Sequence, residues 1–76
     1  MYVHIGKECM IKINDIIGIF DIEVLKKSND YDKLIDNLEI VEDVSENKER
    51  TLILTIDNKA YISNIISTTI ANRINW

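Results

Sequence analysis

The chain opens with apolar and polar residues in alternation, a period of two that is typical of β-strands. Residues 2 to 5 make a short first strand that ends at Gly6, and Lys7-Glu8 supply a turn. From Cys9 to Ile13 every second residue is again apolar. We therefore predict two short strands, followed by a break at Asn14-Asp15.

The next segment, Ile16 to Ile22, is apolar on both sides over most of its length. A strand with this pattern is either central in a sheet or covered by a neighbouring subunit. Gly18 within it lets another backbone approach closely or marks a β-bulge. The residues that we expect at an interface between subunits are Ile16, Ile17, Ile19, Phe20 and Ile22.

Residues 28 to 38 have the features of an amphipathic helix. Ser28-Asn29-Asp30 favour a helix start, and the carboxylates of Asp30 and Asp32 suit the positive end of the helix dipole. Apolar residues then recur at helical spacing and give one face for packing on a sheet. These residues are Tyr31, Leu34, Ile35 and Leu38. We expect a short strand at Ile40-Val41 and an exposed loop over the polar stretch from Glu42 to Glu49.

The last third of the chain predicts a β-hairpin and a short helix. Thr51 to Ile56 and Ala60 to Ser63 read as strands, and Asp57-Asn58 between them tolerate the positive φ of a two-residue turn. Ser67 or Thr68 can then cap a helix that runs through Ile74, with apolar residues four apart on one side. These apolar residues are Ile66, Ile70 and Ile74.

Together these elements predict one α+β domain over residues 1–76. It would have five or six short, mostly antiparallel strands, one amphipathic helix and a short C-terminal helix. At 76 residues the chain is at the low end for an independent core, and such chains are often stabilised by a partner. A lone Cys9 cannot make an intramolecular disulfide, and no signal peptide precedes the first strand, so we expect a cytoplasmic protein.

Charge is distributed unevenly along the chain, whose net charge is −4. Residues 28 to 49 carry eight acidic residues and two lysines, whereas the rest has seven basic residues and five acidic ones. Charges more than about 10 Å apart are largely screened at ordinary salt. An acidic side therefore leaves room for an electropositive side elsewhere on the molecule.

The sequence offers little catalytic chemistry. His4 is the one histidine, and nothing nearby lowers the pKa of the Cys9 thiol to make it a nucleophile. One histidine, one cysteine and scattered carboxylates do not have metal-ligand spacing. We predict no enzyme, no metal and no cofactor. The remaining candidates are basic residues near loops and element ends, namely Lys48, Arg50, Lys59 and Arg73.

Several stretches resemble the RemA/RemB family of bacterial extracellular-matrix (biofilm) gene regulators, and its RemB-like members in particular. They are Met1 to Gly6, Asp15 to Asp21, Tyr61 to Ser63, Ser67 to Ile70, and Arg73. A more distant resemblance to RemA lies in Asn14 with the apolar run behind it, Arg50 leading into Leu52 to Thr55, and Thr69 to Ala71 before Arg73. The similarity covers essentially the whole chain and is weakest in the acidic middle.

The resemblance implies a LytTR-like subunit that assembles into homo-oligomeric rings and binds DNA to regulate transcription. It implies that Lys48, Arg50 and Arg73 contact phosphates. We expect no membrane partner, because the longest apolar run, near Ile16 to Phe20, is too short to span a bilayer. The chain departs from RemA at Asp15, where RemA has an arginine important for DNA binding, and at Asn47-Lys48, where RemA has paired arginines. The alternative is an oligomeric scaffold that does not bind DNA and recruits a protein partner through its acidic face.

Overall fold

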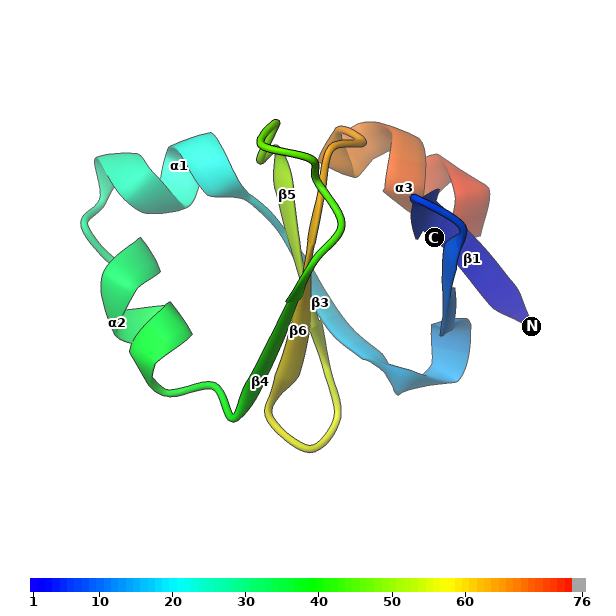
Figure 1. The fold of residues 1–76 in the computed structure, drawn as a ribbon, viewed down its shortest axis with the longest axis horizontal. Coiled ribbons are helices and arrows are strands. Elements are labelled where there is room, and N and C mark those ends of the chain that lie inside the picture. The colour runs from blue at the N-terminus through cyan, green and yellow to red at the C-terminus, as the bar shows by residue number, and fades with distance from the viewer. Residues whose placement is uncertain (75–76) are drawn as a thin grey trace.

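The computed structural model describes residues 1–74, which form a sheet covered on both faces. Figure 1 shows the four-stranded sheet edge-on, with two helices on one face and a β-hairpin and the C-terminal helix on the other. The elements are β1 (Tyr2–Gly6), β2 (Cys9–Lys12), the 3-10 helix η1 (Ile13–Asp15), β3 (Ile16–Asp21), α1 (Ile22–Lys27), α2 (Tyr31–Asp36), β4 (Ile40–Asp43), β5 (Thr51–Thr55), β6 (Lys59–Ser63) and α3 (Ser67–Ile74). The α+β class, the six strands and the C-terminal helix are as predicted.

The hairpin β5–β6 forms the centre of the sheet. Its strands are antiparallel, with Leu52 opposite Ile62 and Leu54 opposite Ala60. Asp57 and Asn58 have φ values of 66° and 56°, the positive values predicted for this turn. The hairpin is confirmed, but the predicted two-residue turn is wrong: Thr55 is opposite Lys59, so the three residues Ile56, Asp57 and Asn58 connect the strands.

The sheet order is β3-β5-β6-β4, and β4 is parallel to β6. β3 pairs with β5 and lies at the edge of the sheet, which rules out the first of the two predicted alternatives, a central position. Ile16 and Ile19 of β3 pack against the core, whereas Ile17 and Phe20 are exposed. Of the two alternatives for Gly18, the β-bulge is confirmed, because the register shifts between Ile16 and Gly18.

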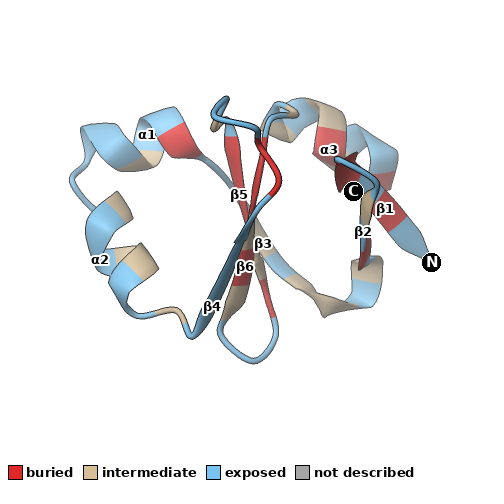
Figure 2. Cartoon of the chain, viewed as in Figure 1, coloured by how far each residue is buried: buried red, intermediate tan, exposed pale blue. Residues whose placement is uncertain are grey.

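Two hydrophobic cores lie on opposite faces of the sheet, and Figure 2 shows buried residues in the central strands β5 and β6 and in the elements that cover them. The core beneath β1, β2 and α3 contains Val3, Ile5, Ile11, Val44, Ile53, Ile70 and Ile74. The core beneath α1 and α2 contains Ile22, Leu52, Ala60 and Ile62. The sheet therefore separates two small cores, each completed by one set of covering elements.

The helix α1 was not predicted. Asp21 ends β3 and caps the helix, with its side chain accepting a hydrogen bond of 2.9 Å from the amide of Glu23. The chain turns here, which sends Ile22 into the core at 1% exposure. Ile22 therefore packs within the subunit, and its prediction as an interface residue is wrong.

Several element boundaries also differ from prediction, among them those of β5, which ends at Thr55, and β6, which begins at Lys59. Ile13 belongs to η1 instead of β2, and the amphipathic helix ends at Asp36. The expected exposed loop starts later, because Glu42 and Asp43 belong to β4. The terminal helix begins at Ser67, and Ile66 before it is exposed, so only two of the three predicted apolar residues are buried.

Candidate nucleic-acid interface

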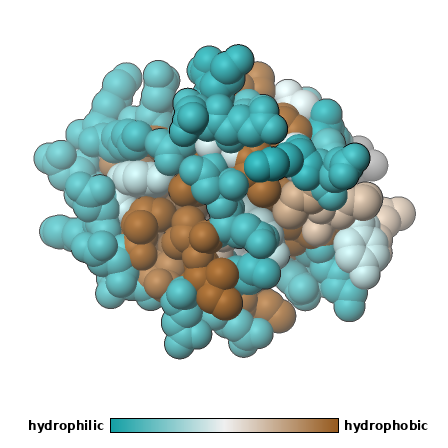
Figure 3. Space-filling view, in the orientation of Figure 1, coloured by the Kyte–Doolittle hydropathy of each residue, from teal (hydrophilic) through white to brown (hydrophobic). Residues whose placement is uncertain are grey.

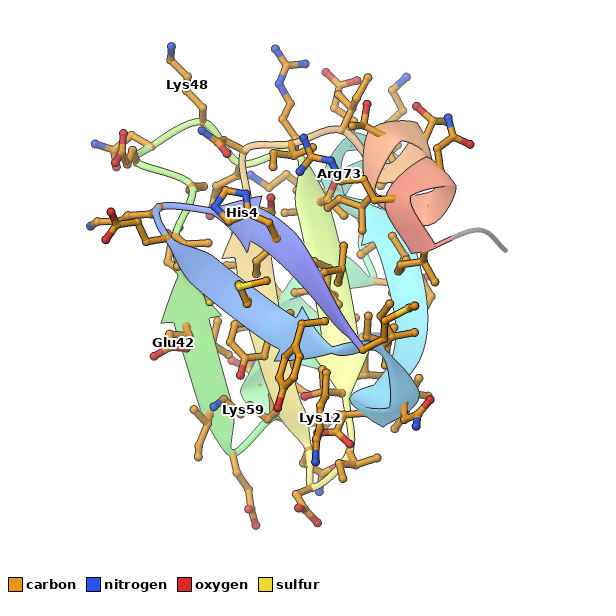
Figure 4. The ribbon with its side chains drawn as sticks, turned by 90° about the vertical axis from the view of Figure 1, so that its right-hand side faces the viewer. His4, Lys12, Glu42, Lys48, Lys59 and Arg73 are labelled. Carbon is orange, nitrogen blue, oxygen red and sulfur yellow. The ribbon has the colours of Figure 1, made fainter. Side chains whose placement is uncertain are left out.

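The three predicted phosphate contacts come from two elements. Lys48 and Arg50 belong to the loop of residues 44–50, which joins β4 to β5, and Arg73 belongs to the last turn of α3. Figure 4 shows Lys48 and Arg73 toward the same end of the molecule, with Lys12 and Lys59 at the opposite end. The fold therefore brings Lys48 and Arg73 to one end, although 25 residues separate them.

Hydrogen bonds hold the backbone of the 44–50 loop in place. The amides of Val44 and Arg50 donate to carbonyls of β6, at 2.9 Å to Ile62 and 3.0 Å to Ser63. The amide of Lys48 donates to the carbonyl of Ser45 at 3.1 Å, and Ser45 itself is fully buried. The loop thus presents exposed side chains from a fixed backbone, which reduces the conformational entropy lost on binding.

Acidic residues lie near Arg50. Arg50 lines a hollow of about 40 Å³ together with Asp21, Glu23 and Ser67. Glu49, the preceding residue, is paired with Lys26 at 3.3 Å, so its charge is partly neutralised. Because acidic groups weaken the attraction of a neighbouring cation for phosphate, Arg50 is a less favourable phosphate ligand than its position in the sequence indicated. The signal that sequence analysis missed is Asp21-Ile22-Glu23, which has an N-cap aspartate before a helical turn.

Arg73 has a structural contact of its own. Its Nη1 donates a hydrogen bond of 2.9 Å to the carbonyl of His4, which joins α3 to β1. A guanidinium has five N–H donors, so the remaining ones are available for an oxyanion. Figure 4 shows the His4 side chain next to Arg73. The contact holds the guanidinium at a defined place on the surface.

Asp15 lies far from the 44–50 loop. It closes η1 at the start of β3, and its carbonyl accepts a hydrogen bond from the amide of Ile56 at 3.0 Å. In the sheet register Ile16 is opposite Thr55, whereas Asp21 is opposite Thr51. Asp15 and Arg50 are thus at opposite ends of β5. Asp15 lines a separate hollow of about 450 Å³ that Lys12 and Lys59 also line.

The acidic middle of the chain is divided between the two faces of the sheet. Asp30, Asp32 and Asp36 belong to α2 or its N-cap, on the helical face. Glu42 instead is opposite Tyr61 in the register, and Tyr61 packs against the core on the other face. The expected segregation of acids to one side therefore holds for α2 and fails for Glu42.

His4 and Cys9 do not form a catalytic pair. His4 is opposite Met10 in the hairpin and its side chain is exposed, whereas Cys9 packs against the core. Partial burial, and then the negative charge of Glu42, raise the pKa of the Cys9 thiol. Such a thiol is less ionised at neutral pH than a free cysteine, which is the opposite of activation.

Among residues 1–74 no group of three or more metal-ligating side chains comes together. No described helix is long and apolar enough to cross a bilayer. The fold and its surface define a small α+β domain that offers two sheet edges and a cation-bearing end.

A family model described as extracellular matrix regulatory protein A-like, or RemA-like, matches residues 2–74. The chain therefore belongs to the RemA-like family, which is a family of regulatory proteins and not of enzymes. No curated protein matches the chain.

Proposed function

We propose that this protein is a RemB-like, DNA-binding transcriptional regulator of extracellular-matrix genes that acts in the bacterial cytoplasm as a homo-oligomeric ring. The observation that carries the proposal is the family match over residues 2–74. The RemB-like assignment rests on the similarity of the opening strand, of the Asp15 to Asp21 segment and of the C-terminal helix. Lys48 and Arg73, near one end of the subunit, supply a surface for phosphates.

Assembly is essential to this proposal, because one subunit offers few cations. Affinity for DNA grows with each phosphate that is neutralised, and a ring repeats the same cations around its circumference. Lys48, Arg50 and Arg73 are the proposed contacts in each subunit. Binding of this kind depends steeply on salt.

The proposed oligomer uses exposed apolar residues of β3. Ile17 and Phe20 are 62% and 36% exposed, whereas Ile16 and Ile19 are partly buried against the core. A small subunit that leaves such residues open at a sheet edge is a candidate for association. Ile22 is excluded from this interface by its burial.

The first experiment combines gel-shift titration on random duplex DNA, at about 50 to 200 mM salt, with light scattering in the same buffers. For a regulator that contacts six to ten phosphates we expect a loss of affinity of about 10³ to 10⁵ over this range. A large oligomer that shows this dependence supports the proposal. An oligomer that does not retain DNA at the lowest salt contradicts it.

Single substitutions then test the contacts. Arg73→Ala and Lys48→Ala should weaken binding at every sequence and lower the salt slope, because each removes one phosphate contact. Light scattering should show the same oligomer. Lys33→Ala, on the last turn of α2 and on the helical face of the sheet, is the matched control and should leave DNA retention unchanged.

The second candidate is an oligomeric scaffold that binds a basic protein partner and no DNA. The acidic residues Asp21 and Glu23, which line one hollow with Arg50, favour it, as does the net charge of −4. Under this candidate the arginine variants change nothing, and the acidic residues of α2 contact the partner.

A further inference from the structure

The outer edge of β4 is open. β4 pairs with β6 on one side, and all four of its residues are exposed. The amides of Ile40 and Val44 donate to β6 carbonyls or its turn, at 3.5 Å to Asn58 and 2.9 Å to Ile62. Because backbone groups alternate in direction along a strand, the N–H and C=O groups of Val41 and Asp43 point away from β6. These groups can be satisfied by a further strand.

An apolar surface adjoins this edge. Val41 is opposite Ala60 and is 37% exposed on the face of α1 and α2, whereas Ile40 is opposite Lys59 and is 53% exposed on the other face. Figure 3 shows a hydrophobic patch where α2 and β4 lie in Figure 1. The partly buried residues of this region are Leu34, Ile35 and Leu38. An open backbone edge next to an apolar surface is suited to the addition of an apolar strand.

We infer that the outer edge of β4 receives β3 of a second copy of this chain, so that the sheets of neighbouring subunits become continuous. The inference rests on the proposed homo-oligomer. It names the outer edge of β4 as the surface that β3 of the neighbouring subunit contacts. β3 is the other outer strand of the four-stranded sheet, and its exposed Ile17 and Phe20 match the apolar surface at β4.

The charges on β4 favour pairing of β3 with β4 over pairing of two β4 strands. If two β4 strands met, Glu42 and Asp43 of both copies would be brought into one ladder, and like charges across strands are destabilising. β3 has no charged residue before Asp21, so it places a neutral strand against these carboxylates. Pairing of β3 with β3 would close a dimer and leave both β4 edges open.

The directions of β3 and β4 determine how neighbouring subunits are oriented in this pairing. β3 and β6 are each antiparallel to β5, and β4 is parallel to β6, so β3 and β4 run in the same direction. A contact between two different surfaces of the subunit repeats from copy to copy and closes a ring when the rotation permits. With parallel pairing, every subunit has the same end up. The ends that bear Lys48 and Arg73 then gather on one rim.

Cross-linking between copies tests the inference. All variants carry Cys9→Ala, which removes the native thiol. One protein carries Ile17→Cys on β3 and another carries Val41→Cys on β4; both positions are exposed, so folding should be unaffected. The two proteins are mixed after denaturation and refolding, treated with a short bis-maleimide, and separated on a denaturing gel. Light scattering reports the oligomer before treatment.

We expect cross-linked dimers in the mixture and none in either protein alone, and a ladder of higher species when both cysteines are in one chain. The matched control replaces Ile17→Cys by Val24→Cys, an exposed apolar position on α1, and should not cross-link with Val41→Cys. Cross-linking of Val41→Cys alone, or an oligomer without cross-links in the mixture, overturns the inference and leaves the proposed oligomer standing. A monomer in light scattering overturns both.

Discussion

Ser63 links three parts of the chain through one buried hydroxyl. Its Oγ donates to the carbonyl of Ile5 at 2.6 Å and accepts from the amide of Ile65 at 3.0 Å. Ser63 is fully buried, so its removal leaves a carbonyl and an amide without this partner. An unsatisfied buried polar group costs about 1–3 kcal/mol.

We therefore expect Ser63→Ala to lower the free energy of unfolding by about 1–3 kcal/mol, measured by urea denaturation. Ser28→Ala is the control, because its hydroxyl bonds to Leu25 at an exposed position. The control should change stability by less than about 0.5 kcal/mol. Equal effects of the two substitutions would contradict the role of Ser63.

The two glycines make different demands. Gly6 ends β1 with φ at +117°, a conformation that side chains rarely adopt. A Cβ there would also lie 3.0 Å from the side-chain oxygen of Asn64. At Gly18 a Cβ would meet only the ring of Phe20, at 2.8 Å, and this ring is partly exposed and can move outward.

Gly6→Ala should therefore destabilise the protein by about 1–3 kcal/mol, the usual cost of a strained backbone position. Gly18→Ala should cost less. Thermal unfolding of the two variants, side by side at one protein concentration, gives the comparison. A larger loss for Gly18→Ala would show that the Phe20 ring is held in place.

At the scale of elements, the junction of β3 and α1 has two roles. The Asp21 carboxylate caps α1, and Asp21 also lines one small hollow together with Arg50. Asparagine caps helices as well as aspartate does and has no charge, whereas alanine loses the cap at a cost of about 0.5–2 kcal/mol.

Under the proposed function Asp21→Asn should strengthen DNA retention at about 100 mM salt with stability unchanged, because it removes a negative charge next to Arg50. Asp21→Ala should show the same gain in retention together with a loss of stability. Gel shift and urea denaturation separate the two effects. Weaker retention by Asp21→Asn would mean that Arg50 does not contact phosphate.

At the scale of the whole molecule, the proposed assembly depends on β3. Phe20→Asp should convert the oligomer to smaller species in light scattering, because an interface would bury the new charge without a partner. Val24→Asp introduces the same charge at an exposed apolar position on α1 and should leave the oligomer intact. Persistence of the oligomer in Phe20→Asp would remove β3 from the interface.

Local patterns determined much of this protein. The β-hairpin with its turn at Asp57-Asn58, the period-two strands and the apolar stripe of α2 follow from residues close together in the sequence. Such features depend on backbone preference and spacing, which a sequence displays directly. The positions of Lys48 and Arg50 in a loop before a strand could also be predicted, because the period-two pattern begins at Thr51.

Tertiary structure decided the rest, since strand order and the positions of distant groups depend on pairing across the chain. An apolar strand such as β3 has the same sequence pattern at the centre of a sheet or at an edge next to another subunit. Only the fold shows that β3 is an edge strand, that β4 is parallel to β6, and that Ile22 turns into the core. Only the fold places Asp21 and Glu23 beside Arg50 and Asp15 at the opposite end of β5, because these relations arise from packing of residues that the sequence keeps apart.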